Sequence, residues 1–92
     1  MIKTLLATLI LLLAFANYSF AWEGYDRKTS GEIEIGSGNL VREGETIRFY
    51  DWETEENHRG EISSVEYKFH GVTIELYDLD EQKNRTFEMQ TN

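Results

Sequence analysis

The residues whose types and spacing come closest to supporting chemistry lie from Asp51 to His58, a segment that also contains five further polar or acidic residues and one tryptophan. Carboxylates together with an imidazole can bind a divalent cation. Such a site requires its ligands to converge, whereas alternating acidic residues on an exposed loop point apart, and runs of charge usually lie in solvent. We therefore expect a solvated acidic loop, and we predict no metal ligand and no cofactor-binding residue in this chain.

Few residues in the chain are suited to catalysis. The sequence has no cysteine, which excludes a thiol nucleophile, a thiolate zinc site and a disulfide framework. No Gly-x-Ser-x-Gly segment is present, and Gly36-Ser37-Gly38 is typical of a flexible turn. The two imidazoles are His58 and His70, and His70 is expected at a hairpin tip, where water would surround a general base. We predict that the protein is not an enzyme and has no catalytic residue.

An aromatic pair marks the best candidate for a binding surface. Residues two apart in an extended segment share a face, so Tyr50 and Trp52 are expected side by side, next to Glu53, Glu55 and Glu56. Trp and Tyr dominate the energetics of binding interfaces, which favours an exposed anchor. The alternative is that the aromatic pair folds back over an open end of the domain. We take these five residues as the candidate interaction surface.

The acidic composition narrows the class of partner. The chain has 9 Lys and Arg against 17 Asp and Glu, with a formal charge of -8. A general nucleic-acid binder needs a basic face to neutralise phosphates, so we expect no nucleic-acid partner. Conversely, a strong negative charge accelerates encounter with a basic protein.

The strands that position these residues are indicated by apolar residues with a period of two. Five segments show this alternation, around residues 33–35, 47–49, 65–69, 72–76 and 87–89, and none shows helical periodicity. His70-Gly71 is expected to form a two-residue hairpin turn, with a positive φ at the glycine. Ile62 and Val65 lie three apart, and this phase break predicts a bulge or bend near Ser63-Ser64.

A weak internal repeat places Tyr-Asp before three of the strands, at Tyr25-Asp26, Tyr50-Asp51 and Tyr77-Asp78. We interpret each aspartate as the start of a turn, in which its side chain accepts hydrogen bonds from the backbone that follows. A recognition function for the repeat is the alternative.

The apolar residues are numerous enough for one small core if the sheet closes on itself. Closure has the further advantage that it removes exposed strand edges. The fold class we predict is all-β: a small five-stranded SH3-like or OB-like barrel. The expected core residues are Ile33, Ile35, Leu40, Val41, Ile47, Phe49, Ile62, Val65, Tyr67, Phe69, Val72, Ile74, Leu76, Phe87 and Met89.

The first 21 residues are expected to be a cleaved signal peptide. Lys3 precedes an apolar run from Leu5 to Phe15, and Ser19 and Ala21 fit the positions before a cleavage site. The run is shorter than a membrane span requires, so no span is expected after cleavage. We predict a single domain over residues 22–92, periplasmic or secreted in a bacterium, with 8 basic and 17 acidic residues.

Three segments of the mature chain resemble a family of small exported bacterial proteins of unknown function. They are Trp22-Glu23-Gly24-Tyr25-Asp26, the stretch from Gly38-Asn39-Leu40-Val41-Arg42 to Ile47, and Tyr50-Asp51. The resemblance extends over nearly all of the mature chain and includes Arg85-Thr86-Phe87-Glu88-Met89. The segment from Trp52 to Arg59 departs from it, because it is longer than the usual turn. The resemblance implies no activity.

Two hypotheses for function follow from the sequence. The first is a non-enzymatic periplasmic binding or structural module that presents a strand edge or groove to an envelope protein, a peptide or a glycan. The second is an acidic inhibitor of a basic secreted hydrolase such as a lysozyme. The sequence carries no signal for an oligomeric state.

Overall fold

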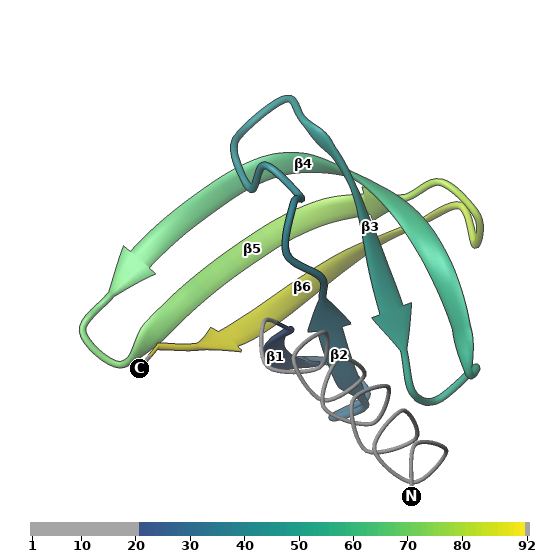
Figure 1. Cartoon of the computed structure of the whole chain (residues 1–92), viewed down its shortest axis with the longest axis horizontal. Helices are drawn as coiled ribbons and strands as arrows, with labels where there is room; N and C mark the ends of the chain where they lie inside the picture. The colour runs from purple at the N-terminus through teal and green to yellow at the C-terminus, as the bar shows by residue number, and fades with distance from the viewer. Residues whose placement is uncertain (1–20, 92) are drawn as a thin grey trace, which may run out of the picture.

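The structure, a computed structural model, describes residues 21–91, and the expected signal peptide lies outside them except for Ala21. Each strand pairs antiparallel with the next, and the last returns to the first, so that the sheet closes into a barrel (Figure 1). The all-β class and the barrel are therefore confirmed, but the expected number of five strands is wrong. The six strands are β1 (Trp22–Asp26), β2 (Glu32–Ile35), β3 (Thr46–Asp51), β4 (Glu56–Lys68), β5 (Gly71–Asp78) and β6 (Lys83–Gln90).

The strand that the sequence did not reveal is β1. Its buried residues are Gly24 and Asp26, and neither is apolar, so the segment lacks the alternation that marks the other strands. Gly24 is required by packing, because a Cβ there would collide with the Glu88 carbonyl oxygen and the Met89 sulfur on β6. Asp26 points inward for an electrostatic reason that is described below.

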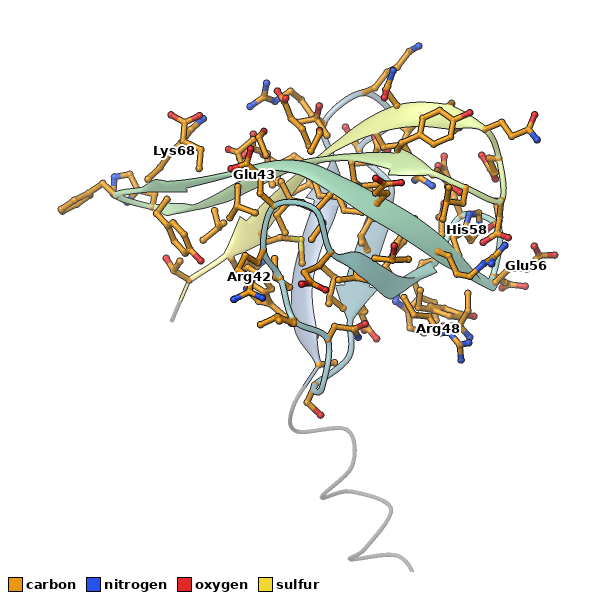
Figure 2. All side chains as sticks on the ribbon, turned by 90° about the horizontal axis from the view of Figure 1, so that it is seen from above. Arg42, Glu43, Arg48, Glu56, His58 and Lys68 are labelled. Carbon is orange, nitrogen blue, oxygen red and sulfur yellow. The ribbon has the colours of Figure 1, made fainter. Side chains whose placement is uncertain are left out.

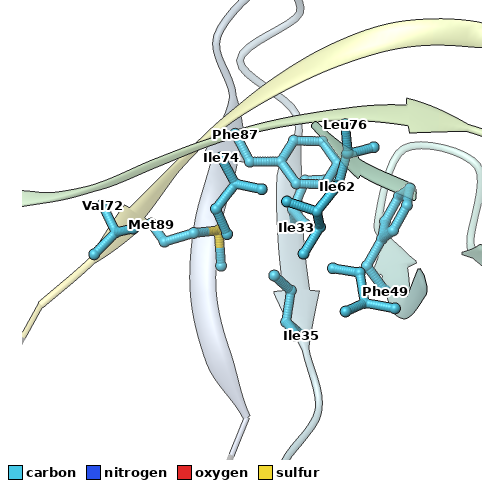
Figure 3. Close-up of a cluster of buried hydrophobic side chains, with 10 residues drawn as sticks. Ile33, Ile35, Phe49, Ile62, Val72, Ile74, Leu76, Phe87 and Met89 are labelled. Carbon is cyan, nitrogen blue, oxygen red and sulfur yellow. The ribbon is translucent and has the colours of Figure 1, made fainter. Parts of the chain in front are cut away.

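Ten apolar side chains fill the barrel (Figure 3). All ten belong to the expected core, and Val41 and Val65 pack against them while remaining partly exposed. Leu40, Tyr67 and Phe69 were wrongly assigned to the core, since 55%, 76% and 93% of their surfaces are exposed. The buried ten are Ile33, Ile35, Ile47, Phe49, Ile62, Val72, Ile74, Leu76, Phe87 and Met89.

Two features of the β4–β5 hairpin bear on the predictions. Lys68 pairs with Gly71, so the turn is Phe69-His70 and begins one residue earlier than expected. Gly71 has no positive φ; it is needed because a Cβ would come within 2.6 Å of the Met89 carbonyl oxygen. The predicted irregularity near Ser63 is confirmed, since the register of β4 against β5 shifts between Ile62 and Ser64.

The arched shape of β4 follows from this bulge and carries the hairpin away from the barrel (Figure 1). The molecule is elongated as a result, with principal extents of 53 × 30 × 24 Å. Over residues 21–91, no helix has the length and apolar character needed to cross a membrane.

Candidate functional site

One end of the barrel contains buried charges that bond to Arg85. Asp26, Asp51 and Asp78 are the last residues of β1, β3 and β5, and in this meander those strands all finish at the same end. The guanidinium group of Arg85 contacts one carboxylate oxygen of each aspartate, at 2.9, 2.9 and 3.0 Å respectively. We call these four residues, together with His58, the Arg85 cluster.

The second carboxylate oxygen of each aspartate binds the turn that follows its strand. Asp26, Asp51 and Asp78 each accept a hydrogen bond from the backbone N–H two residues further on, at 2.8, 2.9 and 3.0 Å. The interpretation of the Tyr-Asp repeat as a turn start is therefore confirmed. Each repeated aspartate does two things at once, because one oxygen orders a turn and the other binds the same arginine.

Arg85 is held in an apolar and aromatic setting. Its side chain is 2% exposed, and its guanidinium carbon lies 5.4 Å from the ring centre of Phe49 and 5.2 Å from that of Phe87. Burial acts to lower the pKa of Arg85, but the hydrogen bonds to the three aspartates outweigh it and raise the pKa above the ordinary value. The arginine is therefore a permanent cation inside the barrel.

His58 completes the cluster from β4. Its Nδ1 lies 2.9 Å from Asp78 Oδ2, and its Nε2 lies 2.9 Å from the Thr54 hydroxyl. Burial acts to raise the pKa of Asp78, but hydrogen bonds from the Glu81 N–H, His58 and Arg85 lower it overall. Within residues 21–91, every buried side-chain nitrogen and oxygen has a hydrogen-bond partner. The cluster is thus a closed polar network that joins β1, β3, β4, β5 and β6.

The one group with metal-ligand geometry among residues 21–91 overlaps this network. Asp51, His58 and Glu81 can bring one ligand atom each within 4.8 Å of one another. Asp51 already bonds Arg85, and both ring nitrogens of His58 have partners. A cation would have to displace Thr54 and lie close to a guanidinium group, so these residues fit a metal ion poorly.

The predicted interaction surface lies on β3 and the turn that follows it. The rings of Tyr50 and Trp52 are adjacent, with centres 4.9 Å apart and planes at 79°. Trp52 is 45% exposed, so it does not close the barrel end, which the Arg85 cluster occupies instead. Glu53 and Glu55 are exposed in the turn, and Glu56 is exposed at the start of β4 (Figure 2).

The expected solvated loop is thus only partly correct. Its three glutamates are in solvent, whereas Asp51 and His58, at its two ends, are among the most buried polar residues of the barrel. Both residues lie in strands and point inward. His58 is paired opposite Phe49, and Asp51 is two residues after Phe49 on the same face of β3. His70, by contrast, is exposed in the hairpin turn where it was expected.

Sequence reasoning missed the central residue of this end, Arg85. A signal was present, since Arg85 is two residues before Phe87 and four before Met89 and therefore shares their inward face. A charged residue in phase with a core stripe, together with three Asp-initiated turns, indicates a buried ion-pair network.

Comparison with known proteins gives one match. A family model described as a family of unknown function (DUF5334) matches residues 22–92. No curated protein matches the chain. No solved structure matches it either.

Proposed function

We propose that this chain, which belongs to the DUF5334 family of unknown function, is a non-enzymatic binding module of the bacterial envelope. A signal peptide over residues 1–21 would export it, and the domain over residues 22–92 would act in the periplasm or outside the cell. Its partner would be an envelope protein, a peptide or a glycan. The polar groups of the Arg85 cluster are already paired. This supports a stabilising role for these buried charges rather than a catalytic one.

The observation that carries this proposal is the exposure of Trp52. A tryptophan that stays half in water forgoes part of the stabilisation that burial would give, and Trp52 is 45% exposed and packs edge-on against Tyr50. Such a rigid aromatic pair offers a large contact area with little loss of side-chain entropy on binding. The surrounding carboxylates of Glu53, Glu55 and Glu56 favour a partner with basic groups around an apolar pocket.

The same acidic rim favours a second candidate function, inhibition of a basic secreted hydrolase such as a lysozyme. In this reading Trp52 would enter the substrate cleft while the glutamates face the basic residues around it. With 8 basic and 17 acidic residues in the mature chain, encounter would be fast at low salt and slower at high salt.

Affinity capture with matched baits tests the surface. Envelope extract is passed over the mature domain, over Trp52→Ala and over Tyr25→Ala at low and high salt. Tyr25 is a suitable control, because it is an aromatic residue on the outer face of β1 with a similar exposure of 48%. We expect capture by the unchanged domain and by Tyr25→Ala, with a loss of at least about tenfold for Trp52→Ala. Equal capture by all three baits would contradict the proposal.

A direct assay separates the two candidate functions. The mature domain is added in excess to a cationic lysozyme, and cell-wall hydrolysis is followed at both salt concentrations. An inhibitor slows hydrolysis at low salt and loses this effect when Glu53, Glu55 and Glu56 are replaced by glutamine. Unchanged hydrolysis, with Trp52-dependent capture of another protein, supports the binding module alone.

A further inference from the structure

The outer edge of β4 is unpaired over its last residues. β3 pairs with β4 only from Glu56 to Glu61, and the backbone of Gly44 and Glu45 bonds Ile62 at 2.8 and 2.9 Å. From Ser64 to Lys68, β4 pairs with β5 alone, and no other segment of residues 21–91 forms a ladder with it. Figure 1 shows this part of β4 at the margin of the sheet, and in Figure 2 it projects beyond the barrel.

Within residues 21–91, this edge lacks the proline, the covering segment and, from Ser64 onward, the bulge that often protect an edge strand, and its charged residues are of opposite sign, Glu66 and Lys68. Val65 and Tyr67 lie on one face of the strand and Glu66 and Lys68 on the other, with no proline and no bulge after Ser64. Tyr67 is 76% exposed and Phe69, in the adjoining turn, 93%. Because Lys68 and Gly71 flank a two-residue turn, Val65 and Tyr67 direct their backbone N–H and C=O groups to the open side.

We propose that a second copy of this chain occupies the edge, with the two β4 strands antiparallel about a twofold axis at Tyr67. In this register Tyr67 lies opposite the partner's Tyr67, and Val65 lies next to the partner's Phe69 at the start of its turn. The interface is self-complementary, as a twofold contact requires. This self-assembly is independent of the proposed binding of a partner and uses a different surface.

Charge selects this register over its neighbours. Glu66 faces the partner's Lys68, and Lys68 faces the partner's Glu66, on the side of the sheet opposite the aromatic residues. A shift that sets Val65 opposite the partner's Tyr67 would place Glu66 against the partner's Glu66, and like charges directly opposite are destabilising. A further shift that sets Val65 opposite the partner's Val65 leaves Glu66 facing a serine. Only the register centred on Tyr67 forms two ion pairs and one continuous apolar row.

The length of the free edge fits the same register. With the axis at Tyr67, the partner's strand ends at Lys68, opposite Glu66, and its turn comes next to Val65, short of the register shift between Ile62 and Ser64. Beyond this shift, the backbone N–H and C=O of Ile62 at the same edge are already bonded to Glu45 and Gly44. The partner's hairpin therefore ends where the existing cover of β4 begins, and no strand has to be displaced.

The pairing leaves the predicted binding surface free. β4 runs from the turn that holds Trp52 to the turn that holds Phe69, so the two surfaces lie at opposite ends of this strand. A dimer would present two copies of Trp52, which increases avidity for a repetitive or immobilised partner. The paired segment is short, so we expect a weak dimer with a dissociation constant of about micromolar or above.

Disulfide trapping tests the register, and it detects weak dimers. The chain has no cysteine, so Tyr67→Cys introduces a single thiol. Because Tyr67 directs its backbone groups to the open side, the two copies of this residue form a hydrogen-bonded pair with Cα atoms about 5.5 Å apart, within the range that a disulfide bridges. Under mild oxidation we expect Tyr67→Cys to form covalent dimers at least about tenfold faster than Tyr25→Cys, whose strand is paired on both sides. Equal rates would overturn the proposal.

A charge swap tests the ion pairs independently. Glu66→Lys and Lys68→Glu each place like charges opposite one another, so we expect the dimer dissociation constant from sedimentation to rise by roughly tenfold. The double variant restores opposite charges and should return it to the original value. Both positions are exposed and outside the core, and circular dichroism verifies that each variant folds. A double variant as weak as the singles would overturn the register.

Discussion

Arg85 Nε on the last strand donates a hydrogen bond of 2.9 Å to Asp26 Oδ2 on the first strand, across 59 residues of sequence. This bond lies at the seam that closes the barrel, where β1 and β6 pair over only three residues. The backbone N–H of Arg27 adds a bond of 2.9 Å to the Thr86 carbonyl oxygen beside it. Closure therefore depends on side-chain charge as well as on the backbone ladder.

Arg85→Met should unfold the domain or come close to doing so. The substitution leaves three buried carboxylates without their shared cation, and breaking a buried ion pair on one side costs about 3–5 kcal/mol. A domain of this size has a comparable total stability, about 3–5 kcal/mol. Urea titration followed by circular dichroism measures the loss. The control is Arg59→Met, which breaks an exposed pair with Asp80 and should leave the urea midpoint nearly unchanged.

Stability should fall as the solution becomes acidic. Burial acts to raise the pKa of Asp78 and of Glu88, but hydrogen bonds and basic neighbours lower each pKa below the ordinary 3.8 and 4.5. The folded state then binds fewer protons than the unfolded chain, so the stabilisation is complete above about pH 5 and is lost as the pH falls through the folded pKa values. Melting temperatures at pH 7, 5, 4 and 3 check this. Glu88→Gln should flatten the dependence in part, and an equal melting temperature at pH 7 and pH 3 would contradict the assignment.

The inward phase of β5 can be tested at two adjacent residues. Ile74 is fully buried between β4 and β6, so Ile74→Ala should cost about 2–5 kcal/mol through lost contacts and a residual cavity. Glu75 points outward, and Glu75→Ala should change the free energy of unfolding by no more than about 0.5 kcal/mol. Chemical denaturation of both variants gives the comparison, and similar losses at the two positions would show that β5 is buried on both faces.

Export should leave Trp22 as the first residue of the mature protein. Ser19 and Ala21 occupy the positions that signal peptidase requires, and the domain match begins at residue 22. Mass spectrometry of protein recovered from the periplasm of an expressing bacterium measures the mass of the chain. A start at Asn17, or a chain that keeps Met1 in the membrane fraction, would show that this assignment of the cleavage site is wrong.

The sequence by itself determined the all-β class, a set of fifteen core candidates that includes all ten buried apolar residues, and the irregularity at Ser63. These features depend on alternation, which a strand with one buried face imposes on its sequence directly. The same reasoning located the three Asp-initiated turns and the Tyr50–Trp52 pair, because both depend on residues close in sequence. β1 escaped detection because its inward residues are a glycine and an aspartate rather than apolar side chains.

Tertiary structure alone decided which alternating residues are covered and which charges are buried. Tyr67 and Phe69 continue the pattern of a core strand, yet they are exposed because β3 ends its pairing with β4 before reaching them. Asp26, Asp51 and Asp78 come from distant parts of the chain and meet Arg85 only because a closed meander brings alternate turns to one end. Burial and ion pairing depend on what lies opposite a residue in space, and that is set by the closure of the sheet.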